Sequence, residues 1–232
     1  MAINVDTVYK TVLLILNQQQ RGYITPDELN KVATQVQLNI FEKYEDDLSQ
    51  QYRAIQNDTE YANRVKNIEE NLQFFQRTGA TAYVGPHFTL TPTDIYRLGS
   101  VFYRGTQLTE YSQRNQITQL LLSPLTQPTT SFPVYLYEND LLYVYPTTII
   151  TGTDITISYL KKPADVIWAY TTGTLGQFIY DTISSVDFEL NVSEQTNVIT
   201  RILAYAGVII NDPTIIQIAA GEVQKEEQNS KQ

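Results

Sequence analysis

The sequence contains no cysteine, which excludes disulfide bonds, thiolate metal sites and cysteine nucleophiles. It contains one histidine, His87, and a single imidazole cannot build the multi-histidine sites that bind zinc. A serine–histidine–aspartate triad would also have to use this one residue. We interpret His87 as an ordinary polar residue of a loop or of the start of a strand.

Long apolar runs and basic clusters are missing as well. The longest nearly continuous apolar segments are TVLLIL at 11–16 and YAGVII at 205–210, whereas a membrane-spanning helix needs about 20 apolar residues. The first residues, MAINVDTVYK, lack the basic region and cleavage site of a signal peptide, so we expect no export signal. The net charge of −9 and the sparse lysines and arginines argue against wrapping of a nucleic acid.

The sequence has none of the common catalytic motifs, including the phosphate-binding loop, the dinucleotide fingerprint, H-E-x-x-H and G-x-S-x-G. Acidic runs occur at 45–47, 69–70 and 226–227, close to expected helix ends or polar helix faces. We interpret these runs as solvated charge. The sequence therefore predicts a protein that is not an enzyme and that uses no cofactor or metal ion.

The composition is that of a globular protein. Of the 232 residues, 42% are hydrophobic and 18% are charged, and a chain of this length builds one large domain or two small ones. The 17 tyrosines concentrate in the middle of the chain. On strands, tyrosine normally packs against β-branched neighbours, so we assign these residues to cross-strand packing.

The N-terminal third carries helical patterns. At 25–44, Thr25 as N-cap, Pro26 in the first turn and Glu28 at the third position form a capping box. Leu29 then starts an apolar stripe at helical spacing that continues through Val32, Val36 and Ile40. A preceding helix is expected over 5–22, with Val8, Val12, Ile15 and Leu16 inward and Gly22 at its end. A third is expected over 59–78, ending before Gly79, and we interpret it as a bundle helix rather than a coiled-coil seam.

The middle of the chain, 80–190, has the composition of strands and turns. We expect one hairpin over 94–112 that turns at Arg104–Thr106, and a second over 134–146 that turns at Glu138–Asp140. A further strand follows at 151–163. Between the two hairpins, 112–125 reads as a short helix that ends before Pro124.

Helix is expected again at the C-terminus. A helix capped by Ser193 has Val198, Ile202, Leu203, Ala206 and Ile210 on its inward face. Asn211 or Asp212 then caps a second helix, with Pro213 in its first turn. The predicted fold class is α+β: a helical bundle built from 1–79 and 191–232, with an inserted antiparallel β-sheet region at 80–190 that contains one short helix.

Three blocks of the sequence, taken in order, resemble structural proteins of podovirus-like tailed phages. They are most similar to the ring proteins, or head-to-tail adaptors, of crAss-like gut phages. The blocks run from MAINVDTVYK to NIFEKY, from VYLYENDLLYVYP to KKPADVIWAY, and from DFELNVSEQT to the C-terminus. The resemblance covers nearly the whole chain and is carried by sequence texture rather than by a catalytic signature.

The resemblance implies a virion protein, made in the cytoplasm of the host bacterium, that forms the head–tail connector below the portal. The expected assembly is a homo-oligomeric ring, twelve subunits in such adaptors, that contacts the portal protein and other ring or tail proteins. DNA would pass through the channel without specific binding, repelled by an acidic lumen, and no membrane is involved. The expected interface with the portal or a neighbouring subunit lies in the C-terminal segment: Pro213, Ile215, Ile216, Ile218, Ala219 and Val223.

Other readings remain open at this point. The exposed tyrosines of a β-domain on a virion or cell surface could bind carbohydrate. Scattered carboxylates could form the acid–base pair of a hydrolase, which would require a concave site with perturbed pKa values. The last apolar helix could also pack into the protein's own core instead of against another chain.

Overall fold

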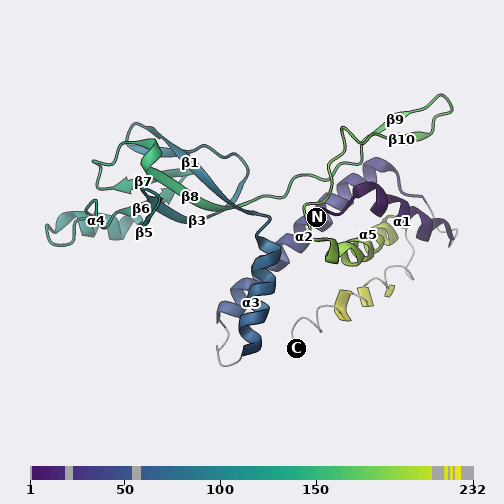
Figure 1. The fold of residues 1–232 in the computed structure, drawn as a ribbon, viewed down its shortest axis with the longest axis horizontal. Helices are drawn as coiled ribbons and strands as arrows, with labels where there is room; N and C mark the ends of the chain where they lie inside the picture. Colours follow the sequence, from purple (N-terminus) through teal and green to yellow (C-terminus); the bar gives the residue numbers. More distant parts are fainter. Residues whose placement is uncertain are drawn as a thin grey trace. The chain divides into compact units, whose positions relative to one another are not determined.

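The computed structural model describes residues 2–18, 23–53, 59–210, 217–218, 220–221 and 223–225. The chain divides into two compact units, which we call the helical unit, 1–74 with 163–232, and the sheet unit, 75–162. Figure 1 labels the elements of both. In the described residues, no helix combines the length and the hydropathy needed to cross a membrane.

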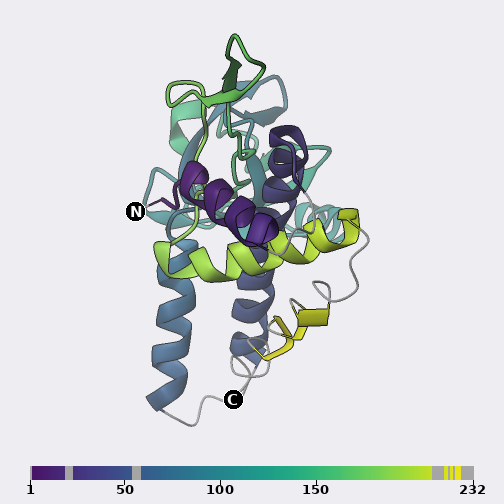
Figure 2. The same ribbon diagram turned by 90° about the vertical axis from the view of Figure 1, so that its right-hand side faces the viewer.

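Among the described residues, the helical unit contains the helices α1, α2, α3 and α5 and one small hairpin. In this unit α2 packs against α3 and α5, and α1 packs against α5, as Figure 2 shows for the neighbouring α1 and α5. The elements are α1 (Val5–Gln18), α2 (Pro26–Arg53), α3 (Thr59–Leu72), α5 (Gln195–Ile210), β9 (Tyr170–Thr172) and β10 (Phe178–Tyr180).

The apolar stripes predicted for these helices form the core of the unit. The following members are buried: Val8, Val12, Leu16, Leu29, Val36, Ile40, Val198, Ile202 and Ala206. The capping box of α2 is confirmed, because the amide N–H of Thr25 donates to Glu28 at 2.8 Å and the amide N–H of Glu28 donates to Oγ1 of Thr25 at 3.3 Å. The backbone amides of Thr25 and Glu28, which have no partner within the helix, are thereby both hydrogen-bonded.

The start of α5 differs from the prediction. A 3₁₀ turn, Val192–Glu194, precedes the helix, and Asn191 caps this turn by accepting a hydrogen bond from the amide N–H of Ser193. The predicted N-cap, Ser193, therefore lies inside the turn. Asparagine and serine are both good caps, so the residue type did not distinguish the two positions.

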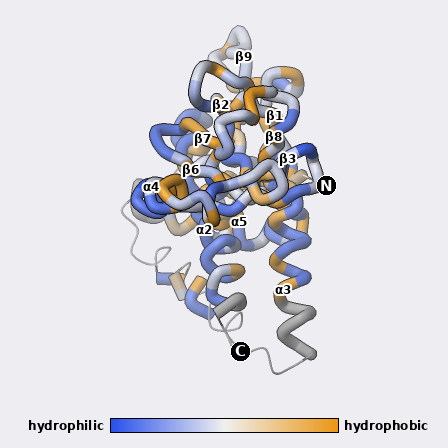
Figure 3. The backbone as a smooth tube through the Cα atoms, turned by 90° about the vertical axis from the view of Figure 1, so that its left-hand side faces the viewer, coloured by the Kyte–Doolittle hydropathy of each residue, from blue (hydrophilic) through white to orange (hydrophobic). Residues whose placement is uncertain are grey.

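The end of α3 also differs from the sequence prediction, which placed it at residue 78. The helix ends at Leu72, and the predicted helical residues 76–78 instead begin strand β1 (Gln76–Val84). Gly79, interpreted from the sequence as a helix stop, lies in the middle of that strand. A Cβ atom there would come within 2.6 Å of Cγ of Pro92, so this glycine marks a close approach rather than a helix end. Figure 3 shows polar and apolar residues mixed along the coloured part of α3.

The sheet unit contains eight strands and one α-helix, α4 (Arg114–Leu122). The strand order is β4-β3-β8-β1-β2-β7-β6-β5. The first half of β1 pairs with β8 and its second half pairs with β2. The remaining strands are β2 (His87–Leu90), β3 (Ile95–Tyr103), β4 (Gln107–Leu108), β5 (Glu110–Tyr111), β6 (Val134–Glu138), β7 (Leu141–Tyr145) and β8 (Ile155–Lys161).

The two edge strands of this sheet are joined by a single residue, Thr109. Its amide N–H and its hydroxyl both donate to the carbonyl of Val101 on β3, at 2.9 and 2.8 Å. The next amide, of Glu110, donates to the carbonyl of Pro133 beside β6. Because one short segment belongs to both ends of the strand order, the sheet must curve round until it is nearly closed.

The predicted hairpins are confirmed. β3 turns at Arg104 and Gly105, and β6 turns into β7 at Asn139 and Asp140, all four with positive φ. α4 ends before Pro124, as expected. The sheet has its own hydrophobic core: Phe88, Val101, Tyr103, Tyr135, Leu142, Val144, Ile149, Ile155, Ile157 and Tyr159.

The predicted fold class, a helical bundle with an inserted antiparallel β-sheet region, is wrong. The structure is rich in sheet, and its eight-stranded, nearly closed sheet is a compact unit with its own core. It is also not purely antiparallel, since β5 and β6 run parallel. The prediction failed because the ladders β1–β8 and β3–β8 join segments far apart in the sequence. Local patterns showed separate hairpins but not the pairing that unites them.

Candidate functional site

The predicted interface residues lie in the C-terminal segment. Of these, Pro213, Ile215, Ile216 and Ala219 lie outside the described residues. Ile218 is 65% exposed, and Val223 is partly buried. The described part of the segment thus presents one large apolar side chain to solvent.

The segment 163–190, to which the sequence analysis assigned no site, carries a further exposed surface. It is extended and lies along α2, where three polar side chains at spacings of four and three residues bind its backbone. Asn30 accepts from the amide of Trp168 at 2.8 Å, and Thr34 accepts from the amide of Val166 at 3.1 Å. Gln37 donates to the carbonyl of Ala164 at 2.7 Å. These side chains replace the strand partner that an extended backbone requires.

Gln37 forms hydrogen bonds with the backbone near both ends of this segment. Its Nε2 donates to Ala164, and its Oε1 accepts the amide N–H of Glu189 at 2.8 Å. The side chain is almost fully buried, with 1% of its surface exposed. Because buried polar groups must be paired, both bonds fix the path of the segment over the helix.

Trp168 anchors the base of the β9–β10 hairpin. Its indole N–H donates to Oδ1 of Asp6 at 3.1 Å, and its ring stacks on Tyr170 and Tyr180 with centroids 5.9 and 5.6 Å apart. The ring of Tyr9 on α1 also contacts Trp168, and the centroids of the two rings are 4.6 Å apart. Aromatic contacts of this kind add to the stability gained from burial, so one face of the hairpin is packed onto α1.

Tyr9 is itself held firmly in this cluster. Its hydroxyl donates to the carbonyl of Ile24 at 3.2 Å and lies 3.5 Å from the hydroxyl of Tyr23. Burial, followed by the hydrogen bond with Tyr23, raises the pKa of the Tyr9 phenol well above its ordinary value. These hydrogen bonds and the ring contact with Trp168 fix the Tyr9 side chain in the cluster.

A cleft of about 420 Å³ opens between α1 and the hairpin. Aromatic rings line much of it, and the ion pair of Asp6 with Lys10 lies among its polar groups. Tyr23 and Phe178 are the exposed aromatic members. The lining residues are Asp6, Tyr9, Lys10, Leu13, Tyr23, Trp168, Gly176, Gln177 and Phe178.

The other face and the tip of the hairpin present apolar side chains to solvent. We define the hairpin patch as Leu175 at the tip and Ile179 on β10, which are 91% and 49% exposed. The turn is ordered by its own hydrogen bonds, from the amide of Gly173 to the carbonyl of Gln177 and from the amide of Leu175 to Oε1 of Gln177. Large apolar side chains held out in this way are typical of interaction surfaces.

A second apolar surface lies on the sheet unit. We define the α4 patch as Leu122, Leu125 and Phe132, which are 79%, 97% and 80% exposed. The helix itself is docked by Ile117, which is buried against Val134 and Leu136. The loop after it is fixed by a hydrogen bond from Gln127 to the carbonyl of Leu121 at 3.0 Å and by the paired Thr129 and Phe132.

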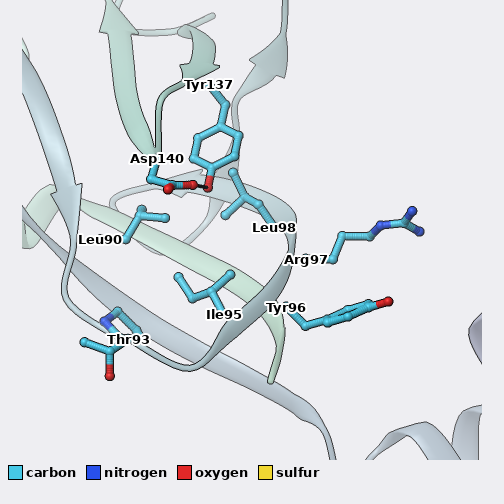
Figure 4. Close-up of a pocket in the computed structure, with 9 residues that line it drawn as sticks. Leu90, Thr93, Ile95, Tyr96, Arg97, Leu98, Tyr137 and Asp140 are labelled. Atoms are coloured by element: carbon cyan, nitrogen blue, oxygen red, sulfur yellow. Dashed lines mark hydrogen bonds between the residues drawn. The ribbon is translucent and has the colours of Figure 1, made fainter. Parts of the chain in front are cut away.

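The sheet unit also has a pocket of about 670 Å³ beside the β6–β7 turn. Figure 4 shows Leu90, Ile95 and Leu98 on one side of the hydrogen bond from Tyr137 to Asp140, while Tyr96 and Arg97 extend away from it. Burial and this hydrogen bond raise the pKa of Tyr137 to about 12. We assign no reaction to this pocket.

Among the described residues, no group of three or more histidine and acidic side chains is placed to hold a metal ion. His87 begins β2, and its ring lies 5.7 Å from that of Tyr143. The sequence did carry a signal for the helix surface that binds 163–190. Asn30, Thr34 and Gln37 recur at helical spacing beside the buried stripe of α2. Their partner segment could not be inferred from that pattern.

Comparison of the sequence with models of known protein families gives no match, and comparison with curated proteins gives none either.

Proposed function

We propose that this chain is a structural subunit of a phage head-to-tail connector, which forms an oligomeric ring below the portal and leaves a channel for DNA. The sequence resemblance to ring proteins of crAss-like phages motivates the proposal. The observation that carries it is the exposure of large apolar side chains on both units, in the hairpin patch and in the α4 patch. A subunit that contacts neighbours on more than one side needs such separate surfaces.

On this proposal the partners are further copies of the chain, the portal protein and other ring or tail proteins. The location is the portal vertex of the virion. The net charge of −9 supports a channel that DNA crosses without binding, because carboxylates repel phosphates. The proposed role is structural rather than enzymatic.

A reconstruction of the virion that contains this chain tests the role directly. We expect closed rings of the chain between the portal and the tail. A location elsewhere in the particle, or absence from it, would contradict the proposal.

Reconstitution tests the predicted C-terminal contact. The full chain mixed with the purified portal should form complexes of defined stoichiometry, measured by native mass spectrometry. Deletion of residues 213–232 should abolish them, while the fluorescence of Trp168, the single tryptophan, reports that the fold is retained. If the deleted form still assembles with the portal, the predicted contact is wrong.

A second candidate function is carbohydrate binding by the exposed aromatic side chains. The cleft between α1 and the hairpin favours it, because Tyr23 and Phe178 expose aromatic faces beside the polar pair of Asp6 and Lys10. A glycan array with clear hits, together with saturable changes in Trp168 fluorescence, would support this function. Tyr23→Ala should then remove binding, whereas Tyr83→Ala on the sheet unit should not.

A further inference from the structure

The eight-stranded sheet closes along only part of its length. β3 pairs with β4 at Phe102 and Tyr103, and β6 pairs with β5 at Val134 and Tyr135. The segment 107–111, which contains β4 and β5, therefore occupies one strand position between β3 and β6 at this level. Among the described strands, none continues this position beside the earlier residues of β3 and the later residues of β6. One strand position of the sheet is thus only partly filled by the chain itself.

The backbone of β6 faces this open position. The carbonyl of Tyr135 accepts from the amide N–H of Ser112 at 2.9 Å, so its backbone groups point away from β7. Alternate residues of a strand present their backbone groups on the same side, and those of Tyr137 point the same way, past the last residue that β5 reaches. On β3, residues 98–100 lie past the last residue that β4 reaches. Strand edges of this kind bind an added strand through main-chain hydrogen bonds.

The pocket of about 670 Å³ lies at the same position. Ile95 and Leu98 of β3 line one side of it, and Tyr137 of β6 lines the other (Figure 4). These three side chains and Leu90 are partly buried and pack against the core of the sheet. An apolar side chain that enters the pocket would extend this core and remove apolar surface from water, which favours binding.

The shape of this site selects a single extended segment. Because strands stand on both sides of it, the broad edge of another folded sheet cannot enter. The pairing of β3 with β8 also shifts register between Leu98 and Val101, and such a bulge bends a strand and disfavours flat pairing between two sheets. A small apolar ligand would fill the pocket but would not pair the backbone of Tyr137.

We propose that this site binds an extended peptide segment of a partner protein, which adds as a strand between β3 and β6 and places an apolar side chain in the pocket. Alternate side chains of a strand point to the same face, so the segment carries apolar, β-branched residues at every second position. The inference goes beyond the proposed ring function and does not depend on it.

Synthetic peptides test the site on the full chain. The probe alternates valine with threonine over about six residues, which spans residues 95–100 of β3, and carries a lysine at each end and a fluorescent label. Its binding, followed by fluorescence anisotropy, should saturate. A control peptide with the same side chains and N-methyl groups on alternate backbone nitrogens should bind about tenfold more weakly, because it loses hydrogen bonds to the strands. Equal affinity of the two peptides, or no saturable binding of the probe, would overturn the inference.

Hydrogen exchange locates the added strand. With the probe bound, the amide of Tyr137 should exchange about tenfold more slowly, because it gains a hydrogen-bond acceptor. The amides of β9 and β10, in the helical unit, should keep their rates. Protection of β9 and β10 instead of Tyr137 would place the binding elsewhere and contradict the inference.

Two leucine variants add a control on the side of the protein. Leu98→Glu puts a carboxylate into the pocket and should weaken binding of the probe about tenfold, because burial of a charge is unfavourable. Leu108→Glu, at a 63% exposed position of β4 outside the pocket, should leave binding unchanged. Equal effects would refute the site. If Leu98→Glu does not fold, the comparison of the two peptides on the natural chain decides by itself. A virion without rings of this chain would refute the ring proposal and leave this site unaffected.

Discussion

The indole N–H of Trp168 donates a hydrogen bond of 3.1 Å to the carboxylate of Asp6, which lies 162 positions earlier in the chain. Asp6 stands in the first turn of α1, and its other oxygen accepts from Lys10 at 2.6 Å. The bond thus joins the first helix to the base of the hairpin.

Replacement of Asp6 by alanine should destabilise the helical unit. Trp168 is 4% exposed, so its N–H would be left buried without an acceptor, at a cost of about 1–3 kcal/mol. Urea unfolding followed by tryptophan fluorescence measures this change. Asp27→Ala is the matched control, because Asp27 also stands in a first turn and pairs with the lysine four residues later, but both side chains are exposed. An equal loss in both variants would contradict the role of the indole bond.

Gln37→Leu should have a larger effect than its conservative size implies. The change removes the Gln37 partner of the part-buried carbonyl of Ala164 and amide of Glu189, at up to about 1–3 kcal/mol for each group. Gln35→Leu, two residues earlier on the exposed face of the same helix, should change the free energy of unfolding by less than about 0.5 kcal/mol. Chemical denaturation of both variants provides the comparison, and similar values would refute the anchoring of the segment.

Acidification should weaken α2 through Glu28. Its bonds from the backbone and then from the hydroxyl of Thr25 lower the pKa of the Glu28 carboxyl below 4.5. A carboxyl with a lowered pKa in the folded state stabilises the fold above its unfolded pKa, and this contribution is lost as the pH falls through the folded value. The stability difference between the natural chain and Glu28→Gln should therefore shrink below pH 4.5, as measured by unfolding at a series of pH values. Glu42→Gln, on the exposed face of α2, serves as control.

Ile117→Ala should release α4 from the sheet unit. Ile117 is the buried residue of this helix, and truncation of a buried isoleucine costs about 2–5 kcal/mol. Hydrogen exchange should accelerate in α4, while the amides of β1 and β8 keep their protection. Leu122→Ala, at an exposed position of the same helix, should leave exchange unchanged. Faster exchange throughout the sheet would mean that α4 is needed for the whole unit.

Short sequence patterns correctly predicted the elements that are stabilised by residues close together in the sequence. The capping box of Thr25 and Glu28 needs only neighbouring residues, and the turn at Asn139 and Asp140 needs only residues that tolerate positive φ. Phe75 shows where such signals mislead. It continued the apolar spacing of α3, yet it lies beyond the helix end and is fully buried.

The candidate surfaces depended on distant contacts. The hairpin patch is exposed because the opposite face of the hairpin packs on Tyr9 through Trp168, and no periodicity in 163–190 shows this. The predicted C-terminal interface was implied by the resemblance to ring proteins and placed on the apolar residues from Pro213 onward, and of that set the structure describes Ile218 and Val223. Apolar composition alone does not tell which side chains a fold leaves uncovered.

The position of Thr109 has a consequence for the protein's behaviour in a crowded cell. Open sheet edges are templates on which other chains add strands, and such growth leads to aggregation. Thr109 joins β4 directly to β5, so the two edge strands have two residues each and belong to one short segment next to Val101 and Pro133. The two edge strands themselves therefore offer little unpaired backbone on which another chain can add a strand.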